Sequence, residues 1–319
     1  MTNAHIEISI KGQWVTVPAV EIGGRSIVVT GRRLRVATVH DEDWLEDELD
    51  DPESCIRRLK ACRSNGAKAD VFTFAQKLPA ETPKYSYRME WNSIAAIRLT
   101  TFADWWEKLP KDTRKNTRRA AKRGVVVKFR ELDDALIGGL VALNNDSPMR
   151  QGVPFAHFGK TVEEVRKDYS SFRDRSDFIC AYLGDELIGL MKLVYCGKVA
   201  AIMQLLTKSR HYDKRPANVL ITTAVERCAQ RGISYVTYGR YRYGNKDNSS
   251  LIDFKDRNGF VEVLVPKYHV PLTLRGAVCL KLGLHRGLVG TLPSSVIRVG
   301  AALRAKWYSW RLRAGVAQW

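Results

Sequence analysis

The stretch FICAYLGDELIGLMKLVYCGKVAAIMQLL, residues 178–206, decides the fold of this chain. Two apolar runs flank the pair Gly184-Asp185, and a third apolar run follows Gly197. A glycine–aspartate pair between apolar runs is typical of a β-hairpin turn. We therefore predict strands at 178–183, 186–194 and 199–206, each joined to the next by a tight turn.

Helical patterns precede and follow these strands in the sequence. Helices are predicted at 134–144, 162–172 and 216–230, the last stopping at Gly232. Further strands are predicted at 125–130, 234–238 and 261–265, and earlier in the chain within 5–39, at 70–75 and at 95–99. Pro52 is predicted to open another helix. Together these elements predict a mixed α/β fold.

The charge of the chain is strongly positive and concentrated in two regions. The formal net charge is +18; residues 101–130 hold ten Lys/Arg against three acids, and residues 271–319 hold eight Lys/Arg and no acid. Such surfaces imply an anionic partner: nucleic acid, a phosphorylated donor or anionic lipid. Spacings of three and four between residues 111 and 122 put most of the basic residues on one helix side, which also fits an ordinary exposed helix.

Cysteine usage and the N-terminus indicate a cytoplasmic protein. The six cysteines form no Cys-x-x-Cys pair and have no histidine-rich neighbour, so no metal site is predicted and buried free thiols are expected. The first residues carry neither the basic nor the apolar segment of a signal peptide. No apolar run approaches the roughly 20 residues of a membrane-spanning helix.

A loop rich in glycine and aromatic residues follows the strand predicted at 234–238. Residues 238–260 read YGRYRYGNKDNSSLIDFKDRNGF. So many glycines, aromatic rings and polar groups in one segment would be unfavourable if they served packing alone, and they suit a loop beside a ligand. The candidate catalytic residues here are Lys255, Tyr238, Tyr241, Tyr243 and Asp253.

The order of elements resembles that of a GNAT acyltransferase domain, most strongly over residues 105–272. Two features resemble the FemABX branch, whose members carry two GNAT-like halves: the basic helix RKNTRRAAKRG at 114–124, and Phe254-Lys255 followed by Asn258-Gly259-Phe260. The resemblance implies an N-terminal half at 1–104, a basic linking helix at 105–124 and an acyltransferase domain at 125–273. A basic amphipathic helical tail would follow at 274–319.

The resemblance also implies where an acyl donor binds. Strands 200–206 and 234–238 would splay and expose backbone groups to the donor, with the amine acceptor entering from the other side. The implied donor-binding residues are Gln204, Leu206, Lys208, Arg210, Lys214, Arg215 and Asn218. The loop lacks the glycines of the usual CoA-binding pattern, and Pro216 removes an N–H group. Aminoacyl-tRNA is therefore an alternative donor to acyl-CoA, and no tightly bound cofactor is expected.

Roles for individual residues follow from this resemblance. Lys255 would neutralise charge near the donor, a tyrosine at 238, 241 or 243 would protonate the leaving group, and Asp253 is a candidate base, although the tyrosines equally suit packing. The candidate substrate-binding residues lie in the polar loop after the helix at 134–144 and in the aromatic loop at 238–260: Arg150, Gln151, His157, Asn245 and Ser249.

The sequence of the C-terminal tail is compatible with three kinds of partner. Residues 296–313 are amphipathic at helical period and mix tryptophan with arginine, which suits docking on the chain itself, tRNA or peripheral contact with the inner membrane face. The sequence as a whole predicts an N-acyltransferase that moves an acyl or aminoacyl group from an aminoacyl-tRNA or acyl-CoA donor onto an amine. The alternative is a non-catalytic GNAT-fold protein that binds RNA or anionic membrane.

Overall fold

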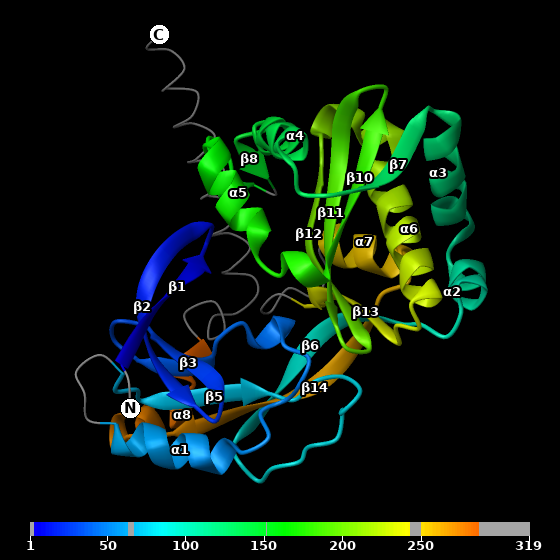
Figure 1. Cartoon of the computed structure of the whole chain (residues 1–319). Helices are drawn as coiled ribbons and strands as arrows, with labels where there is room; N and C mark the ends of the chain where they lie inside the picture. The colour runs from blue at the N-terminus through cyan, green and yellow to red at the C-terminus, as the bar shows by residue number, and fades with distance from the viewer. Residues whose placement is uncertain (1–2, 63–66, 151, 243–249, 287–319) are drawn as a thin grey trace. The chain divides into compact units, whose positions relative to one another are not determined.

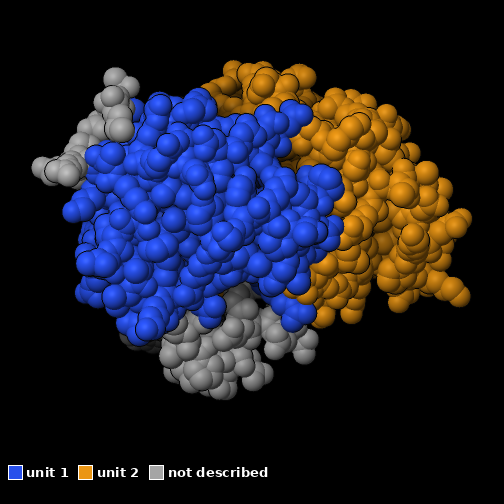
Figure 2. All heavy atoms as spheres, turned by 90° about the horizontal axis from the view of Figure 1, so that it is seen from below, with its two compact units in different colours: residues 1–94, 242–245, 263–292 blue, residues 95–241, 246–262, 293–319 orange. Residues whose placement is uncertain are grey.

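The computed structural model describes residues 3–62, 67–150, 152–242 and 250–286 (Figure 1). The chain forms two compact units, coloured in Figure 2: unit 1 takes its described residues from 1–94, 242–245 and 263–292, and unit 2 from 95–241, 246–262 and 293–319. The units alternate along the chain, whereas the sequence predicted successive boundaries at 104, 124 and 273. The difference arises because the late strand β14 (Val261–Pro271) pairs with the early strand β5 (Val71–Ala75).

The sheet of unit 2 contains the strands predicted around residues 178–206. Its order is β13 (Tyr235–Arg240), β12 (Val199–Thr207), β11 (Glu186–Cys196), β10 (Ser176–Leu183) and β7 (Val125–Arg130). Neighbours are antiparallel except β12 and β13, which are parallel. The predicted hairpin is confirmed, because Leu183 pairs with Glu186 across the turn.

Helices cover both faces of this sheet, and strand alternation determines which residues face them (Figure 1). Phe178 and Cys180 belong to the core with α4 (Asp134–Asn144) and α5 (Val162–Ser170). Ile179 and Ala181 belong to the core with α2 (Phe102–Lys108), α3 (Lys111–Lys122) and α6 (Pro216–Gln230). Successive side chains of a strand point to opposite faces, so one apolar run supplies both cores. A last helix of the unit, α7, spans Ser250–Arg257.

The basic helix predicted at 105–124 is two helices. α2 ends at Lys108 and α3 begins at Lys111, with Pro110 between them. Proline lacks an N–H and disfavours helical conformation in the residue before it, so a helix stops there. α3 buries Thr113, Thr117 and Ala120, whereas most of its basic side chains are exposed: Lys111, Lys115, Arg118, Arg119 and Lys122.

Unit 1 also contains a mixed set of paired strands. Their order is β1 (Asn3–Ile10), β2 (Gln13–Ile22), β3 (Arg25–Thr30), β4 (Val36–Val39), β5 and β14, with β4 and β5 parallel. β6 (Met89–Arg98) begins in unit 1 and ends in unit 2. Helix α1 (Pro52–Ala61) opens at proline as predicted and buries Cys55, Ile56 and Leu59 in the core of this unit. Helix α8 (Leu274–Lys281) follows β14.

Short elements complete the described chain. They are the strands β8 (Met149–Arg150) and β9 (Val153–Pro154) and the 3-10 turns η1 (Glu42–Trp44), η2 (Arg173–Arg175), η3 (Ser209–Lys214) and η4 (Leu284–Arg286). All six cysteines are free, and five of them are buried. Within the described ranges, the longest apolar helices fall short of what a bilayer crossing requires.

Candidate active site

The parallel strands β12 and β13 pair over a short length and then part. The described residues pair from Val199–Tyr235 to Ala201–Thr237, although β12 continues to Thr207 and β13 to Arg240. Beyond Ala201, β12 still bonds to β11 on its other edge, as far as Thr207. The backbone groups on the inner edges of the two strands therefore face a divergence, which is where side chains from the surrounding loops gather.

Lys255 is the central residue on the β13 side of this divergence. Its side chain, in the short helix α7, is fully buried, and its ammonium donates a hydrogen bond to the carbonyl of Arg240 at the end of β13. The same ammonium lies 4.9 Å from the centroid of the Tyr238 ring, a cation–π contact. Burial lowers the pKa of Lys255 from 10.5 to about 8, because charge is disfavoured in a dry environment.

The aromatic residues of this loop hold α7 against the strand. The rings of Tyr238 and Phe260 lie 5.9 Å apart, and the Tyr241 hydroxyl donates to the carboxylate of Asp256. Gly259 has a φ of +80°, and a Cβ there would lie 2.6 Å from the indole nitrogen of Trp105. Glycine is therefore required at 259 by both conformation and space. Asp253 is exposed in the first turn of α7, and its predicted role as a base stays a prediction.

Asn218 belongs to the same region through a partner that the sequence did not suggest. Its amide nitrogen donates to the side-chain oxygen of Asn258 at 3.1 Å, and Asn258 donates in turn to the carbonyl of Phe254 at 2.7 Å. Asn258 is almost fully buried. The two asparagines tie the start of α6 to the end of α7. The sequence singled out Asn258 only as part of a signature, because nothing local distinguishes a buried asparagine.

A histidine–aspartate pair lies on the β12 side. His157 Nδ1 is 2.9 Å from Asp168 Oδ2, and Nε2 is 3.5 Å from the amide nitrogen of Gln204 on β12. With Gln204 donating to Nε2, the ring proton lies on Nδ1 and is donated to Asp168. The aspartate side chain is 6% exposed and also accepts from Lys160 at 2.6 Å, whereas the His157 side chain remains 20% exposed. The sequence missed Asp168, which looks like an ordinary surface residue of α5.

Arg150 is held by the backbone around this pair. Its guanidinium donates to the carbonyl of Thr207 at 3.2 Å and to that of Leu143 at 3.4 Å, and it lies 4.5 Å from the centroid of the Phe155 ring. These contacts attach the 150 loop to the end of β12. The role predicted for Arg150, recognition of an acceptor, stays a prediction.

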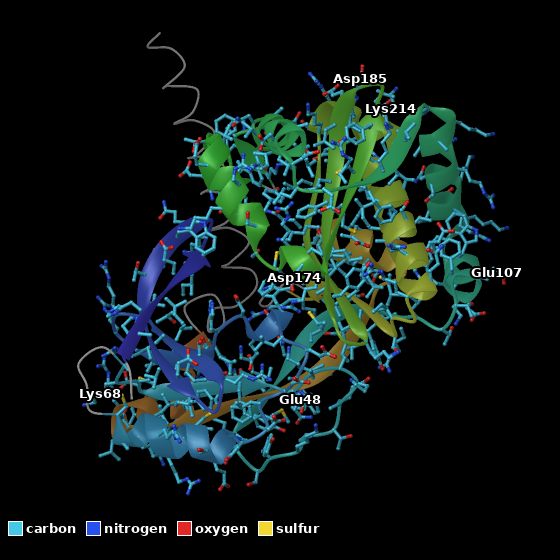
Figure 3. The ribbon with its side chains drawn as sticks, viewed as in Figure 1. Glu48, Lys68, Glu107, Asp174, Asp185 and Lys214 are labelled. Atoms are coloured by element: carbon cyan, nitrogen blue, oxygen red, sulfur yellow. The ribbon has the colours of Figure 1, made fainter. Side chains whose placement is uncertain are left out.

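The cations predicted to hold donor phosphate gather around a carboxylate. Lys208 donates to Glu186 Oε1 at 2.6 Å, Arg210 donates to the same oxygen, and His211 Nε2 lies 3.0 Å from Glu186 Oε2. Their hydrogen bonds, that of Lys208 first, lower the pKa of Glu186 to about 2. Figure 3 places Asp185 and Lys214 at this end of the unit 2 sheet. A phosphate that binds these cations would have to compete with Glu186.

The remaining predicted donor residues lie near this loop. Lys214 pairs with Asp213 at 3.0 Å, and Arg215 adopts a left-handed conformation, φ 60°, at the start of α6. Leu206 is buried in the core that α4 and α5 share with the sheet, and pairs with Leu190. Four predicted site residues, together with the 296–313 tail, lie outside the described residues: Gln151, Tyr243, Asn245 and Ser249.

A mixed sheet that opens at its one parallel pair, in the described part of unit 2, defines a GNAT-type acyltransferase fold. Residues 107–255 match the family model described as "Acetyltransferase (GNAT) domain", so this part of the chain is a GNAT domain and the predicted family is confirmed. No curated protein matches the sequence.

Solved structures share the fold over most of the chain. The C-terminal domain (DUF2156) of a putative lysylphosphatidylglycerol synthetase from Agrobacterium fabrum is similar with a TM-score of 0.55 and 14% identity, over 84% of this chain and 88% of that one. FemX gives a TM-score of 0.51 and 10% identity, over 88% and 90%. L-PGS from Bacillus licheniformis gives 0.53 and 13%, over 84% and 86%. At these identities the likenesses show a shared fold.

Proposed function

We propose that this protein is an N-acyltransferase that moves an acyl or aminoacyl group onto an amine at the divergence of β12 and β13. The observation that carries the proposal is a pair of side-chain groups beside the two strands. Buried Lys255 lies against Tyr238 of β13, and His157 lies against Gln204 of β12. The first group supplies positive charge and the second supplies a proton acceptor. Acyl transfer to an amine is accelerated by both.

The acceptor side activates the nucleophile. An amine attacks the acyl carbonyl carbon, the carbon–nitrogen bond forms, and the amine then loses a proton. Nε2 of His157 takes that proton, because its Nδ1 proton is held by Asp168 at 2.9 Å. Lys160 donates to the same carboxylate, so Asp168 is held in place beside the imidazolium that forms. This arrangement follows the general logic of a base oriented by a third group.

The donor side stabilises the leaving group. As the bond from the acyl carbon to the donor oxygen or sulfur breaks, negative charge develops on that atom. The Lys255 ammonium, with a pKa of about 8, is protonated at neutral pH and is poised to stabilise this charge or to protonate the atom. Tyr238 lies against the ammonium and fixes its position, so the tyrosine acts as a positioning residue.

The donor that we propose is aminoacyl-tRNA rather than acyl-CoA. The loop after β12 lacks glycine, and its cations Lys208 and Arg210 contact Glu186, which disfavours a compact pyrophosphate site. A tRNA donor instead binds mainly through many phosphate contacts spread over a basic surface. The exposed basic side of α3 would supply such contacts.

A transfer assay tests the proposal. Purified protein is incubated with tRNA charged with a labelled amino acid, or with acetyl-CoA, and with a panel of amino acids and polyamines, and alkali-stable amide product is counted. We expect Lys255→Met and His157→Gln each to lower transfer by about 100-fold or more while tRNA binding is retained. His5→Gln, at an exposed position, is the control. Unchanged transfer in Lys255→Met would refute the donor role.

One observation favours a second function, non-catalytic binding of RNA or anionic membrane. The basic side chains of α3 are exposed, and Arg118 lies 5.8 Å from the ring of Trp106, a pairing that also suits an anionic surface. Peripheral membrane contact through 296–313 belongs to the same proposal. Salt-dependent binding to uncharged tRNA or to phosphatidylglycerol vesicles, with no transfer from any donor, would favour this function over catalysis.

A further inference from the structure

Two histidines and a glutamate converge in unit 1. Glu90 comes from β6, His269 from β14 and His285 from η4, and one potential ligand atom of each lies within 4.8 Å of the others. The three positions are far apart in the sequence. For that reason a search for closely spaced cysteines and histidines predicted no metal site.

The fold holds these three residues in place. The backbone N–H of His269 donates to the carbonyl of Arg88 at 2.8 Å, so His269 and Glu90 lie on adjacent segments. Helix α8 brings His285 back to them. It begins with a cap in which Thr273 accepts from the Gly276 N–H, and a Cβ at Gly276 would lie 1.9 Å from the carbonyl oxygen of Asp70. Helix and backbone thus touch, which leaves η4 little freedom.

The hydrogen bonds of His285 match those of a metal-ligating histidine. Its Nε2 lies 2.7 Å from Glu90 Oε1, and its side chain is only 5% exposed. Its Nδ1 is buried and has no hydrogen-bond partner among the described residues. A proton on Nε2, donated to Glu90, leaves a buried lone pair on Nδ1. An unsatisfied buried group of this kind costs about 1–3 kcal/mol, and a bound ion would satisfy it.

The second imidazole is also available as a ligand. The rings of His269 and His285 lie 4.8 Å apart, centroid to centroid. Burial, with a smaller opposing effect from Glu90, lowers the pKa of His269 to about 4, so this ring is neutral at physiological pH. One potential ligand atom of each imidazole lies within 4.8 Å of the other, which is near the spacing of about 3–3.5 Å between donor atoms around a tetrahedral zinc ion.

We propose that His269 and His285 bind a divalent transition-metal ion of the zinc class, and that Glu90 is the outer carboxylate that holds the Nε2 proton of His285. Neutral imidazole is a ligand that zinc accepts, and water would fill the remaining positions of the ion. Arg286 opposes the ion, because its Nε and Nη2 both lie 3.0 Å from Glu90 Oε1. Removing Arg286 should therefore tighten binding, a result that a purely structural ion pair does not predict.

Metal titration of the full-length chain tests this inference separately from any transfer activity. The protein is stripped with a chelator and titrated with Co²⁺, whose visible absorption reports tetrahedral nitrogen and oxygen ligands, and Zn²⁺ is then used as competitor. We expect one ion per chain. His269→Gln and His285→Gln should weaken binding by more than about 100-fold, and Arg286→Gln should strengthen it. His5→Gln should leave it unchanged.

Thermal unfolding with and without Zn²⁺ guards against loss of folding in the variants. Zinc should raise the melting temperature of the wild type and of Arg286→Gln, and should leave that of His269→Gln and His285→Gln unchanged. The inference is overturned if the stripped wild type binds neither ion at micromolar concentration. It is also overturned if binding survives both histidine substitutions, or if Arg286→Gln does not tighten it.

Discussion

Replacement of Lys255 by methionine should change how stability depends on pH, not only activity. Burial lowers the pKa of this lysine from 10.5 to about 8. Between these two pH values the folded chain has released the proton while the unfolded chain still holds it. Because the unfolded state then binds more protons, the free energy of unfolding rises with pH through this window. Below about pH 8 both states are protonated, and the full cost of burying the charge is present.

The size of the effect follows from the same two values. Each unit of pKa corresponds to about 1.4 kcal/mol, so the difference between 10.5 and about 8 amounts to about 3 kcal/mol. Lys192, also fully buried and with a pKa lowered by burial to about 8, adds a contribution of the same sign. Buried Cys180 and Cys228 act in the opposite direction at alkaline pH, because burial raises the pKa of each thiol to about 12. Only the difference between wild type and variant isolates Lys255.

Urea unfolding of wild type and Lys255→Met, followed by circular dichroism from about pH 7 to about pH 10.5, gives this difference. The wild type should gain about 3 kcal/mol relative to the variant across the window. Lys198→Met, at an exposed position, sets the effect of removing a surface lysine. Parallel curves for wild type and Lys255→Met would refute the argument that Lys255 is desolvated, and with it the tuned ammonium in the proposed mechanism.

Two other substitutions test the surroundings of the site. Gly259→Ala should destabilise unit 2 by about 2–4 kcal/mol in thermal unfolding, because its Cβ would lie 2.6 Å from the Trp105 indole nitrogen. The control is Gly184→Ala, which is also at positive φ but has open space around it and should cost only about 1–2 kcal/mol. Equal costs for the two variants would contradict the packing argument. Glu186→Gln should tighten the binding of inorganic pyrophosphate by releasing the cations that contact it, and unchanged or weaker affinity in calorimetry would show that those cations do not face the ligand.

Local signals predicted most of unit 2. The Gly184-Asp185 turn, the helix that ends before Gly232 and the strand before the aromatic loop all depend on residues next to each other in the chain. The helix predicted at 105–124 is two helices, because the helical structure breaks at Pro110 between α2 and α3. Periodicity identifies a helix face, but proline determines where the helix stops.

The chemistry of the site was less predictable, because partners meet from distant positions. Nothing near Asp168 in the sequence indicates that it contacts His157, and nothing near Glu186 indicates that it contacts Lys208. The sequence suggested Lys255 as a charge at the ligand, yet burial is a property of the folded chain and cannot be read from one lysine. The same limit applies to Glu90 and His269, whose proximity is set by strand pairing.

The two sets of cations differ in what an incoming anion would gain from them. Lys208 and Arg210 contact Glu186, so a phosphate at that loop must displace a carboxylate whose pKa these cations hold near 2. Lys255 is different, because desolvation alone lowers its pKa to about 8. A negative charge near Lys255 relieves that cost, and the developing charge of a leaving group is such a charge. In the proposed mechanism, Lys255 would therefore stabilise the transition state, whereas the loop would not bind a phosphate tightly in the ground state. Such a distribution of binding energy accelerates a reaction.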